Sequence, residues 1–132
     1  MFMSKWPIEN IPDEDFIFRN AKDTWLKPDN TVDPYVFWDF ESNGIETSVI
    51  WDKYCSGPFG AKSMAKEPER YGVFKLNAGI VRKVENQTVE HKPTTNRAHS
   101  LINGEKNEEI LFRLLEISEL VIAIPPYKPA IR

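Results

Sequence analysis

The chain has 132 residues and a formal net charge of −3 at pH 7, and 41% of its residues are apolar and 12% aromatic. Such a length can bury a core without disulfides or metals, so we expect one domain over residues 1–132. Within it, residues 1–12 read as an N-terminal extension and residues 125–132 as an extended proline-rich tail. Lysine and arginine form no run, so we expect no nucleic-acid partner.

The single cysteine, Cys55, excludes an internal disulfide and indicates a reducing compartment. The first residues lack the apolar stretch of a signal peptide, and no segment approaches the ~20 apolar residues that span a bilayer. We therefore expect a cytoplasmic protein with no membrane partner. A lone cysteine beside Tyr54 is more typical of a structural role than of a catalytic nucleophile.

The first half of the chain predicts three strands. Residues 15–20 place Phe on one face and Ile and Arg on the other, which is typical of a strand. Residues 35–40 are largely aromatic and β-branched and form the strongest strand candidate. Residues 46–51 follow a turn at Ser42-Asn-Gly44, so we expect 35–40 and 46–51 to be antiparallel neighbours.

The second half predicts short strands and one long helix. A short helix is expected at 61–66, strands at 72–76, 88–91, 98–102 and 120–124, and either a strand or a helical turn at 78–84. Residues 107–120 predict a helix, with Asn107 as its cap and two glutamates in its first turn. The expected fold is α+β: a mostly antiparallel sheet, with curling left open, packed against this main C-terminal helix.

One segment, residues 91–104, holds both histidines of the chain, His91 and His99, together with Asn96 and Arg97. A neutral imidazole can act as a general base, and Arg97 can hold an anion. Alternatively, Asn96 forms a side-chain turn, and each histidine lies on the surface or is hydrogen-bonded in the core. Two histidines without a third one or a nearby cysteine leave only carboxylates such as Glu90 to complete a zinc site, so we expect no metal and no cofactor.

A charged residue, Arg19, interrupts the apolar strand at 15–20. We expect it to point outward; the alternatives are an ion pair, with Asp39 as the obvious partner, or a place in a pocket. The aromatic residues are expected to be plain core, or else to line a cavity for a flat ligand. They are Trp25, Tyr35, Phe37, Trp38, Trp51 and Tyr54.

The stretch Asn96-Arg-Ala-His-Ser-Leu-Ile-Asn-Gly104, with the Arg19 strand and Ser48-Val ahead of it, resembles small bacterial proteins of mobile-cassette and accessory-gene type. That resemblance implies a bacterial accessory protein and no particular chemistry. The order of Arg19, Thr47-Ser48 and a later Glu90 or Glu105 is also similar to that in enzymes that transfer ADP-ribose.

Two hypotheses follow. The first is a small accessory or interaction protein without catalytic activity, either a homodimer through an aromatic sheet face or bound to another protein. The second is a binder of, or enzyme acting on, a nucleotide-like or other anionic small molecule. In it, His99 is the catalytic residue. The expected ligand-binding residues are Arg19, Trp38, Ser48, Tyr54, His91, Asn96 and Arg97.

Overall fold

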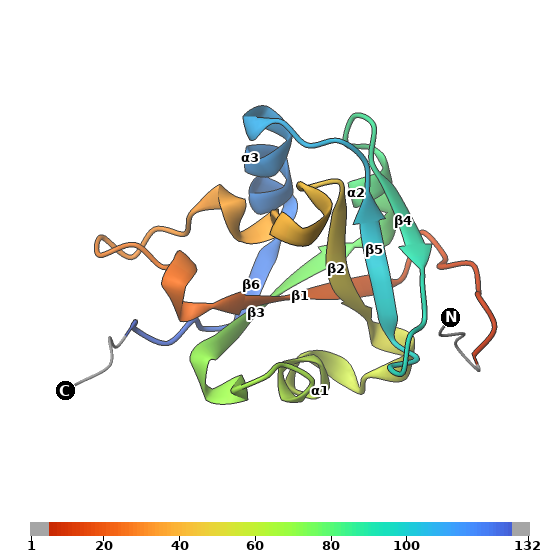
Figure 1. Cartoon of the computed structure of the whole chain (residues 1–132), viewed down its shortest axis with the longest axis horizontal. Helices are drawn as coiled ribbons and strands as arrows, with labels where there is room; N and C mark the ends of the chain where they lie inside the picture. The colour runs from red at the N-terminus through yellow and green to blue at the C-terminus, as the bar shows by residue number, and fades with distance from the viewer. Residues whose placement is uncertain (1–5, 128–132) are drawn as a thin grey trace.

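The structure is a computed structural model, and it describes residues 6–127. Six strands form one antiparallel sheet in the order β4-β5-β2-β1-β3-β6 (Figure 1). The strands are β1 (Phe16–Lys22), β2 (Glu46–Trp51), β3 (Tyr71–Asn77), β4 (Thr88–His91), β5 (His99–Asn103) and β6 (Glu119–Ile122). The helices are α1 (Gly57–Ser63), α2 (Ala78–Arg82) and α3 (Glu108–Ile117). The predicted α+β fold with an antiparallel sheet is confirmed, and the sheet is uncurled.

Both faces of the sheet are covered. On one face, α3 packs with the 3-10 helix η2 (Pro34–Phe37), and this side holds the larger core. That core includes Ile17, Val36, Phe37, Val49, Trp51, Leu76, Ile102, Leu111 and Leu114. The opposite face packs against α1 (Figure 1). There, Phe18 and Val73 belong to one buried cluster with Ala61. The sequence predicted that the C-terminal helix covers one face of the sheet. It did not predict that α1 covers the opposite face.

The predicted strand at 35–40 is wrong, because this segment forms the 3-10 helices η2 and η3 (Phe40–Ser42). Pro34 has no N–H and stands at the first position of η2, and the Asp33 carboxylate accepts from the Tyr35 amide. These local bonds close the turn, while Val36 and Phe37 still reach the core. Consequently, the predicted hairpin with 46–51 does not form, and β2 pairs with β5 and β1 instead.

The other expected elements fall close to observed ones. The strand at 88–91 coincides with β4, and the segment at 78–84, left open between strand and helix, forms α2. The helix at 107–120 is shorter, since it ends at Ile117 and the chain turns into β6. That last strand is exposed or half-buried along its whole length. In the predicted tail, Pro126 and Tyr127 are exposed, whereas residues 128–132, like residues 1–5 of the predicted extension, lie outside the described residues.

Two neighbouring strands, β1 and β2, pair at one end only. Their register joins Ile17 to Trp51 and Phe18 to Ile50. Beyond this point β1 stays with β3 as far as Lys22, whereas β2 continues along β5 back to Glu46. The strands therefore diverge, and the first half of β2 has an edge that β1 does not cover.

Candidate functional site

The uncovered edge of β2 is satisfied by side chains instead of a strand. At Ser48, the backbone carbonyl accepts from Arg19 Nη1 at 2.8 Å, and the backbone N–H donates to Asp39 Oδ2 at 2.8 Å. At Glu46, the Ser42 hydroxyl bonds both the backbone N–H and the carbonyl. Because buried backbone polar groups need partners, these side chains hold the split between β1 and β2 open.

Contrary to our expectation, Arg19 does not point outward. Its guanidinium donates to Asp39 Oδ1 at 2.7 Å and through Nε to the Val36 carbonyl at 2.9 Å, and the side chain is only 13% exposed. The Asp39 carboxylate thus joins Arg19 to Ser48 through its two oxygens. The alternative that the sequence left open, an ion pair with Asp39, is the one observed.

His99 lies on the other side of Ser48. Its Nδ1 is 2.7 Å from the Lys92 carbonyl, and its Nε2 is 3.3 Å from the Ser48 hydroxyl. A carbonyl only accepts, so Nδ1 carries the proton and Nε2 is left to accept from the hydroxyl of Ser48. The backbone at Lys92 therefore sets the tautomer and orientation of the ring, and leaves a basic nitrogen directed at Ser48.

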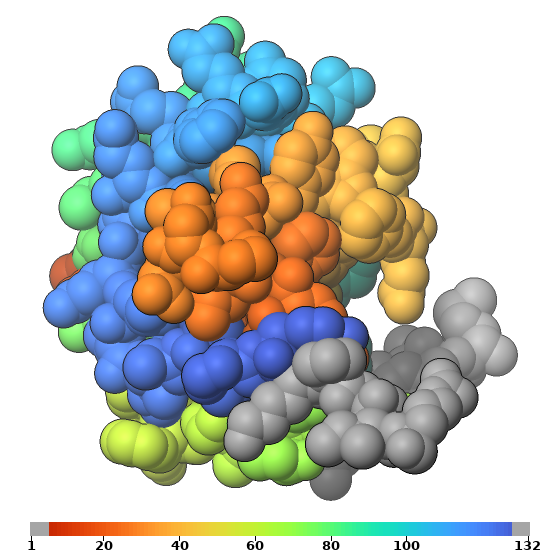
Figure 2. Space-filling model, turned by 90° about the vertical axis from the view of Figure 1, so that its left-hand side faces the viewer, coloured from red at the N-terminus to blue at the C-terminus, as the bar shows by residue number. Residues whose placement is uncertain are grey.

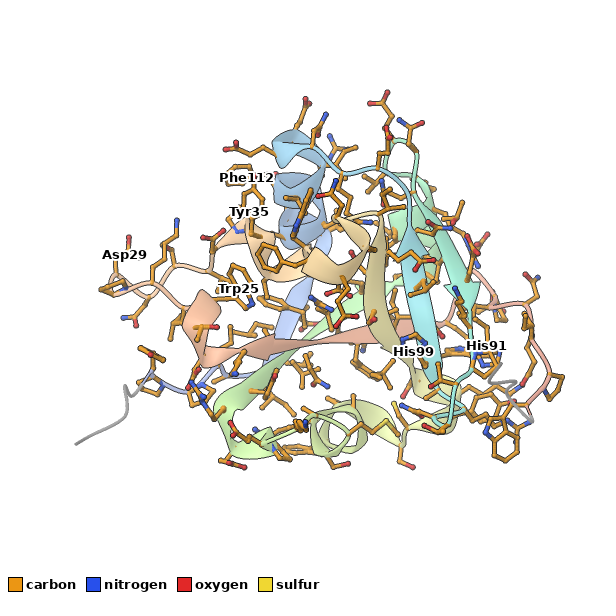
Figure 3. All side chains as sticks on the ribbon, in the orientation of Figure 1. Trp25, Asp29, Tyr35, His91, His99 and Phe112 are labelled. Atoms are coloured by element: carbon orange, nitrogen blue, oxygen red, sulfur yellow. The ribbon has the colours of Figure 1, made fainter. Side chains whose placement is uncertain are left out.

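These residues line two adjoining hollows that share Asp39 and Ser48, and we call the pair the groove. The first hollow, of about 340 Å³, is also lined by Arg19, Lys22, Trp25 and Tyr71. The second, of about 380 Å³, is also lined by Glu41, Glu46, Lys92, Thr94 and His99. Each volume is within the range of about 300–1,000 Å³ that is common for small-molecule sites. Trp25 and His99 mark the two ends (Figure 3).

The two ends of the groove differ in character. At the first end, Lys22 makes no ion pair with any described residue and lies near two rings, Trp25 and Tyr71. At the second end, Glu46 lies 3.4 Å from Lys92, and Glu41 adds a further carboxylate. The groove thus offers rings and a cation at one end, and hydrogen-bond acceptors with an imidazole at the other.

Three of the expected ligand-binding residues, Tyr54, His91 and Arg97, gather elsewhere. The Arg97 guanidinium lies 4.1 Å from the centre of the Tyr54 ring, and His91 Nε2 donates to the Arg97 carbonyl. Glu9 ties them together: its amide donates to His91 Nδ1, and its carboxylate accepts from the Tyr54 hydroxyl. These contacts anchor the N-terminal segment to the sheet, although Arg97 Nε is buried without a hydrogen-bond partner among the described residues.

The two histidines are close in sequence, but their side chains lie on opposite faces of the sheet. His91 pairs with Ser100 across β4 and β5, so its side chain lies on the Ser100 face, and that of His99 on the opposite face. His91 is buried with its ring 5.1 Å from that of Trp51. One histidine thus belongs to the N-terminal anchor and the other to the groove.

Two further expected ligand-binding residues lie apart from the groove. Asn96 accepts from the Ala98 amide, which is the side-chain turn that the sequence offered as an alternative, and it donates to Met64 Sδ. Trp38 packs 5.7 Å from the Tyr35 ring and against Gly44, where φ is +80° and any side chain would overlap the indole. It lines a separate hollow beside Lys106.

Sequence reasoning missed several residues of the groove. Asp39 was anticipated only as a partner of Arg19, and Lys22 and Lys92 were not anticipated at all. Nothing in the sequence marks these lysines, because their place depends on where β1 leaves β2. The buried Lys106 was also missed; its ammonium lies 3.0–3.1 Å from the carbonyl oxygens of Gly44, Ile45, Ile102 and Gly104, which share its three N–H donors. Burial lowers the pKa of Lys106 to about 8.

The structure also bears on a reactive cysteine, a metal site and a membrane-spanning helix. Burial raises the pKa of the Cys55 thiol to about 11, which is the opposite of what a thiolate nucleophile needs. Among residues 6–127, no group of three or more His, Cys, Asp or Glu side chains is arranged to hold a metal ion. In the same part of the chain, no helix is long and apolar enough to cross a membrane.

Comparisons with protein-family models, with curated proteins and with solved structures gave no match to this chain. Its function therefore has to be argued from the groove itself.

Proposed function

We propose that the groove binds a nucleotide-like ligand. The observation that carries the proposal is that Arg19, Ser48 and His99, far apart in sequence, line one concave surface together with Trp25 and Lys22. A nucleotide combines a flat base, an anionic phosphate and ribose hydroxyls. Each of these three parts has suitable partners in the groove.

Different residues of the groove suit the base, the phosphate and the ribose of a nucleotide. A base can stack on the Trp25 or Tyr71 ring, and such stacking contributes about 1–3 kcal/mol per base in other proteins. A phosphate can approach Lys22 and the N–H groups that Arg19 does not donate to Val36, Ser48 or Asp39. Ribose hydroxyls can donate to Glu41 or Asp39 in the acidic half.

Thermal unfolding with added ligand tests the proposal. We expect adenosine monophosphate or diphosphate to raise the melting temperature, since a ligand at a hundred times its dissociation constant adds about 2.7 kcal/mol of stability. Inorganic phosphate and adenosine alone should each give a smaller shift. No shift with any nucleotide would refute the proposal.

Two variants locate the site. Trp25→Ala should weaken binding about tenfold by removing the stacking partner. Lys22→Gln should weaken it about fivefold, because an exposed charge pair contributes at most about 1 kcal/mol. Lys27→Gln is the matched control, since Lys27 is exposed and lies outside the groove. Equal effects of the two lysine variants would place the ligand elsewhere.

A second candidate function, as an interaction protein, is favoured by exposed rings on η2, η3 and α3. We define the aromatic surface as Tyr35, Trp38, Phe40 and Phe112. Phe40 is 73% exposed and Phe112 53% exposed. Figure 2 shows the side of the molecule on which the segment around residues 25–40 protrudes beside α3.

The occupant that we propose for the aromatic surface is a second copy of the chain, in keeping with the homodimer expected from the sequence. Unlike that expectation, the rings do not lie on a sheet face, because helices cover both faces. Light scattering after gel filtration should give a dimer mass, and Phe40→Ser with Phe112→Ser should give a monomer. Phe59→Ser on α1, whose ring is 75% exposed, is the control and should remain dimeric. A monomeric native protein would refute this candidate.

The likeness to small bacterial accessory proteins and the single cysteine support a further, broader proposal. We propose that the protein is a bacterial accessory protein that works in the cytoplasm.

A further inference from the structure

The Ser48 hydroxyl and the His99 ring have the relation of a nucleophile to its base. The Ser48 oxygen lies 3.3 Å from His99 Nε2, and the Lys92 carbonyl holds Nδ1–H at 2.7 Å on the far side of the ring. In serine hydrolases, the base is likewise oriented by a third group that accepts from its other nitrogen. Here a backbone carbonyl takes that position, and a distance slightly above 3.2 Å is common before substrate binds.

The pair is also accessible. Ser48 and His99 are both only partly buried, and both line the second hollow of the groove. Ser100 on β5 is buried, and its hydroxyl donates to the Ala98 carbonyl. The Ser48 hydroxyl instead faces the imidazole of His99.

We propose that Ser48 is a catalytic nucleophile and His99 its general base, and that the groove hydrolyses carboxylic esters. This inference uses the same groove as the proposed function but does not require that the ligand be a nucleotide. It assigns a reaction to residues that the binding proposal treats only as contacts.

The reaction balances with water as the only co-substrate. The Ser48 oxygen bonds to the ester carbonyl carbon while its proton passes to His99 Nε2, and the carbonyl π electrons move to oxygen. Collapse of this tetrahedral species breaks the bond to the alcohol, which leaves with the proton from His99. Water then attacks the acylated serine with His99 again as base, and releases the acid and free Ser48.

The negative charge of the tetrahedral species needs a stabilising group. The Ser48 amide cannot supply it, because that N–H already bonds Asp39. Arg19 lines the first hollow together with Ser48, and three of its five N–H groups are donated to Val36, Ser48 and Asp39. We assign the remaining N–H groups of Arg19 to the charge that develops on the ester oxygen.

Covalent labelling tests the nucleophile. An alkyl fluorophosphonate should form a phosphorus–oxygen bond at Ser48 with loss of fluoride, and peptide mapping by mass spectrometry should find the adduct there. His99→Ala should slow labelling at least about 100-fold, as expected for loss of a general base. Ser63→Ala, which removes an exposed hydroxyl on α1, is the control and should label at the native rate.

The outcomes separate the two proposals. No adduct at Ser48 in the folded protein, or unchanged labelling of His99→Ala, would overturn the inference. If His99→Ala does not fold, His99→Gln serves instead, because its amide can still donate toward the Lys92 carbonyl. Turnover of 4-nitrophenyl acetate that stops after fluorophosphonate treatment would confirm the ester class, and an adduct without turnover would overturn it. Labelling without any nucleotide-induced stabilisation would refute the binding proposal alone.

Discussion

A single carboxylate, Asp39, connects the structure of the split sheet to its chemistry. It bonds the Arg19 guanidinium with one oxygen and the Ser48 amide with the other. Removing it would leave a largely buried guanidinium and a backbone N–H without this partner. The same residue borders both halves of the groove, so the fold and the site depend on it together.

We expect Asp39→Ala to lower the free energy of unfolding by about 3 kcal/mol, because it breaks a largely buried ion pair and a backbone hydrogen bond. Urea unfolding followed by tryptophan fluorescence measures the change. The control is Asp13→Ala, which breaks the more exposed pair with Arg82 and should cost less than about 1 kcal/mol. Equal losses in both variants would contradict this view of Asp39.

A second residue-scale prediction concerns Lys106, whose pKa burial lowers from 10.5 to about 8. The unfolded chain keeps this proton to higher pH than the folded protein does. Between about pH 8 and 10 the unfolded state therefore binds more protons, and this residue makes stability rise with pH, by at most about 1.4 kcal/mol per pH unit.

Unfolding free energies measured from pH 7 to 10 check this. In Lys106→Met the contribution should vanish, so the native protein should gain stability relative to the variant as pH rises. At pH 7 the variant should lose about 3 kcal/mol, since four carbonyls lose their donor. A difference between the two proteins that stays constant with pH would contradict the lowered pKa.

At the scale of elements, the sequence predicted those that local chemistry determines. The Asn107 cap and the apolar stripe of α3 are visible in the chain, as is the alternation in β4. The segment at 35–40 was predicted wrongly because its aromatic and β-branched composition favours a strand, whereas Val36 and Phe37 reach the core from a 3-10 helix and Tyr35 and Phe40 are exposed. The groove was only partly predictable: Arg19, Ser48 and His99 were among the candidate site residues and border it, whereas Asn96 does not, and nothing local indicates that β1 leaves β2 after Phe18.

The cap of α3 gives a prediction at this scale. The side-chain oxygen Oδ1 of Asn107 accepts from the Ile110 amide at 2.9 Å. Asn107→Ala should therefore cost about 1 kcal/mol of unfolding free energy, whereas Asn107→Asp retains an acceptor and should stay close to native. A loss of the same size in both variants would show that the cap is not the cause.

Across the whole molecule, two cores on opposite faces share one sheet. The smaller core contains Cys55, packed with Phe18 and Ala61 beneath α1. Cys55 is 4% exposed, and burial raises the pKa of its thiol to about 11. The rate at which the thiol reacts with a reagent therefore depends on how often this core opens and on the fraction of the thiol that is ionised.

Alkylation with iodoacetamide should accordingly be slow at pH 8 in the native protein and fast in denaturant, where a thiol has an ordinary pKa of about 8.5. Ala61→Gly, which loosens the contact with α1, should speed native labelling. Rapid alkylation of the untreated native protein would mean that α1 does not shield the smaller core.

The divergence of β1 from β2 also gives the molecule its own spectroscopic probe. The Ser48 amide hydrogen bonds the Asp39 carboxylate and not a main-chain carbonyl, so its resonance reports on Asp39 rather than on the sheet. Any molecule that draws Asp39 away will shift this one signal and hasten its exchange with deuterium. Occupancy of the groove could then be read from one nitrogen, with the rest of the sheet as an internal reference.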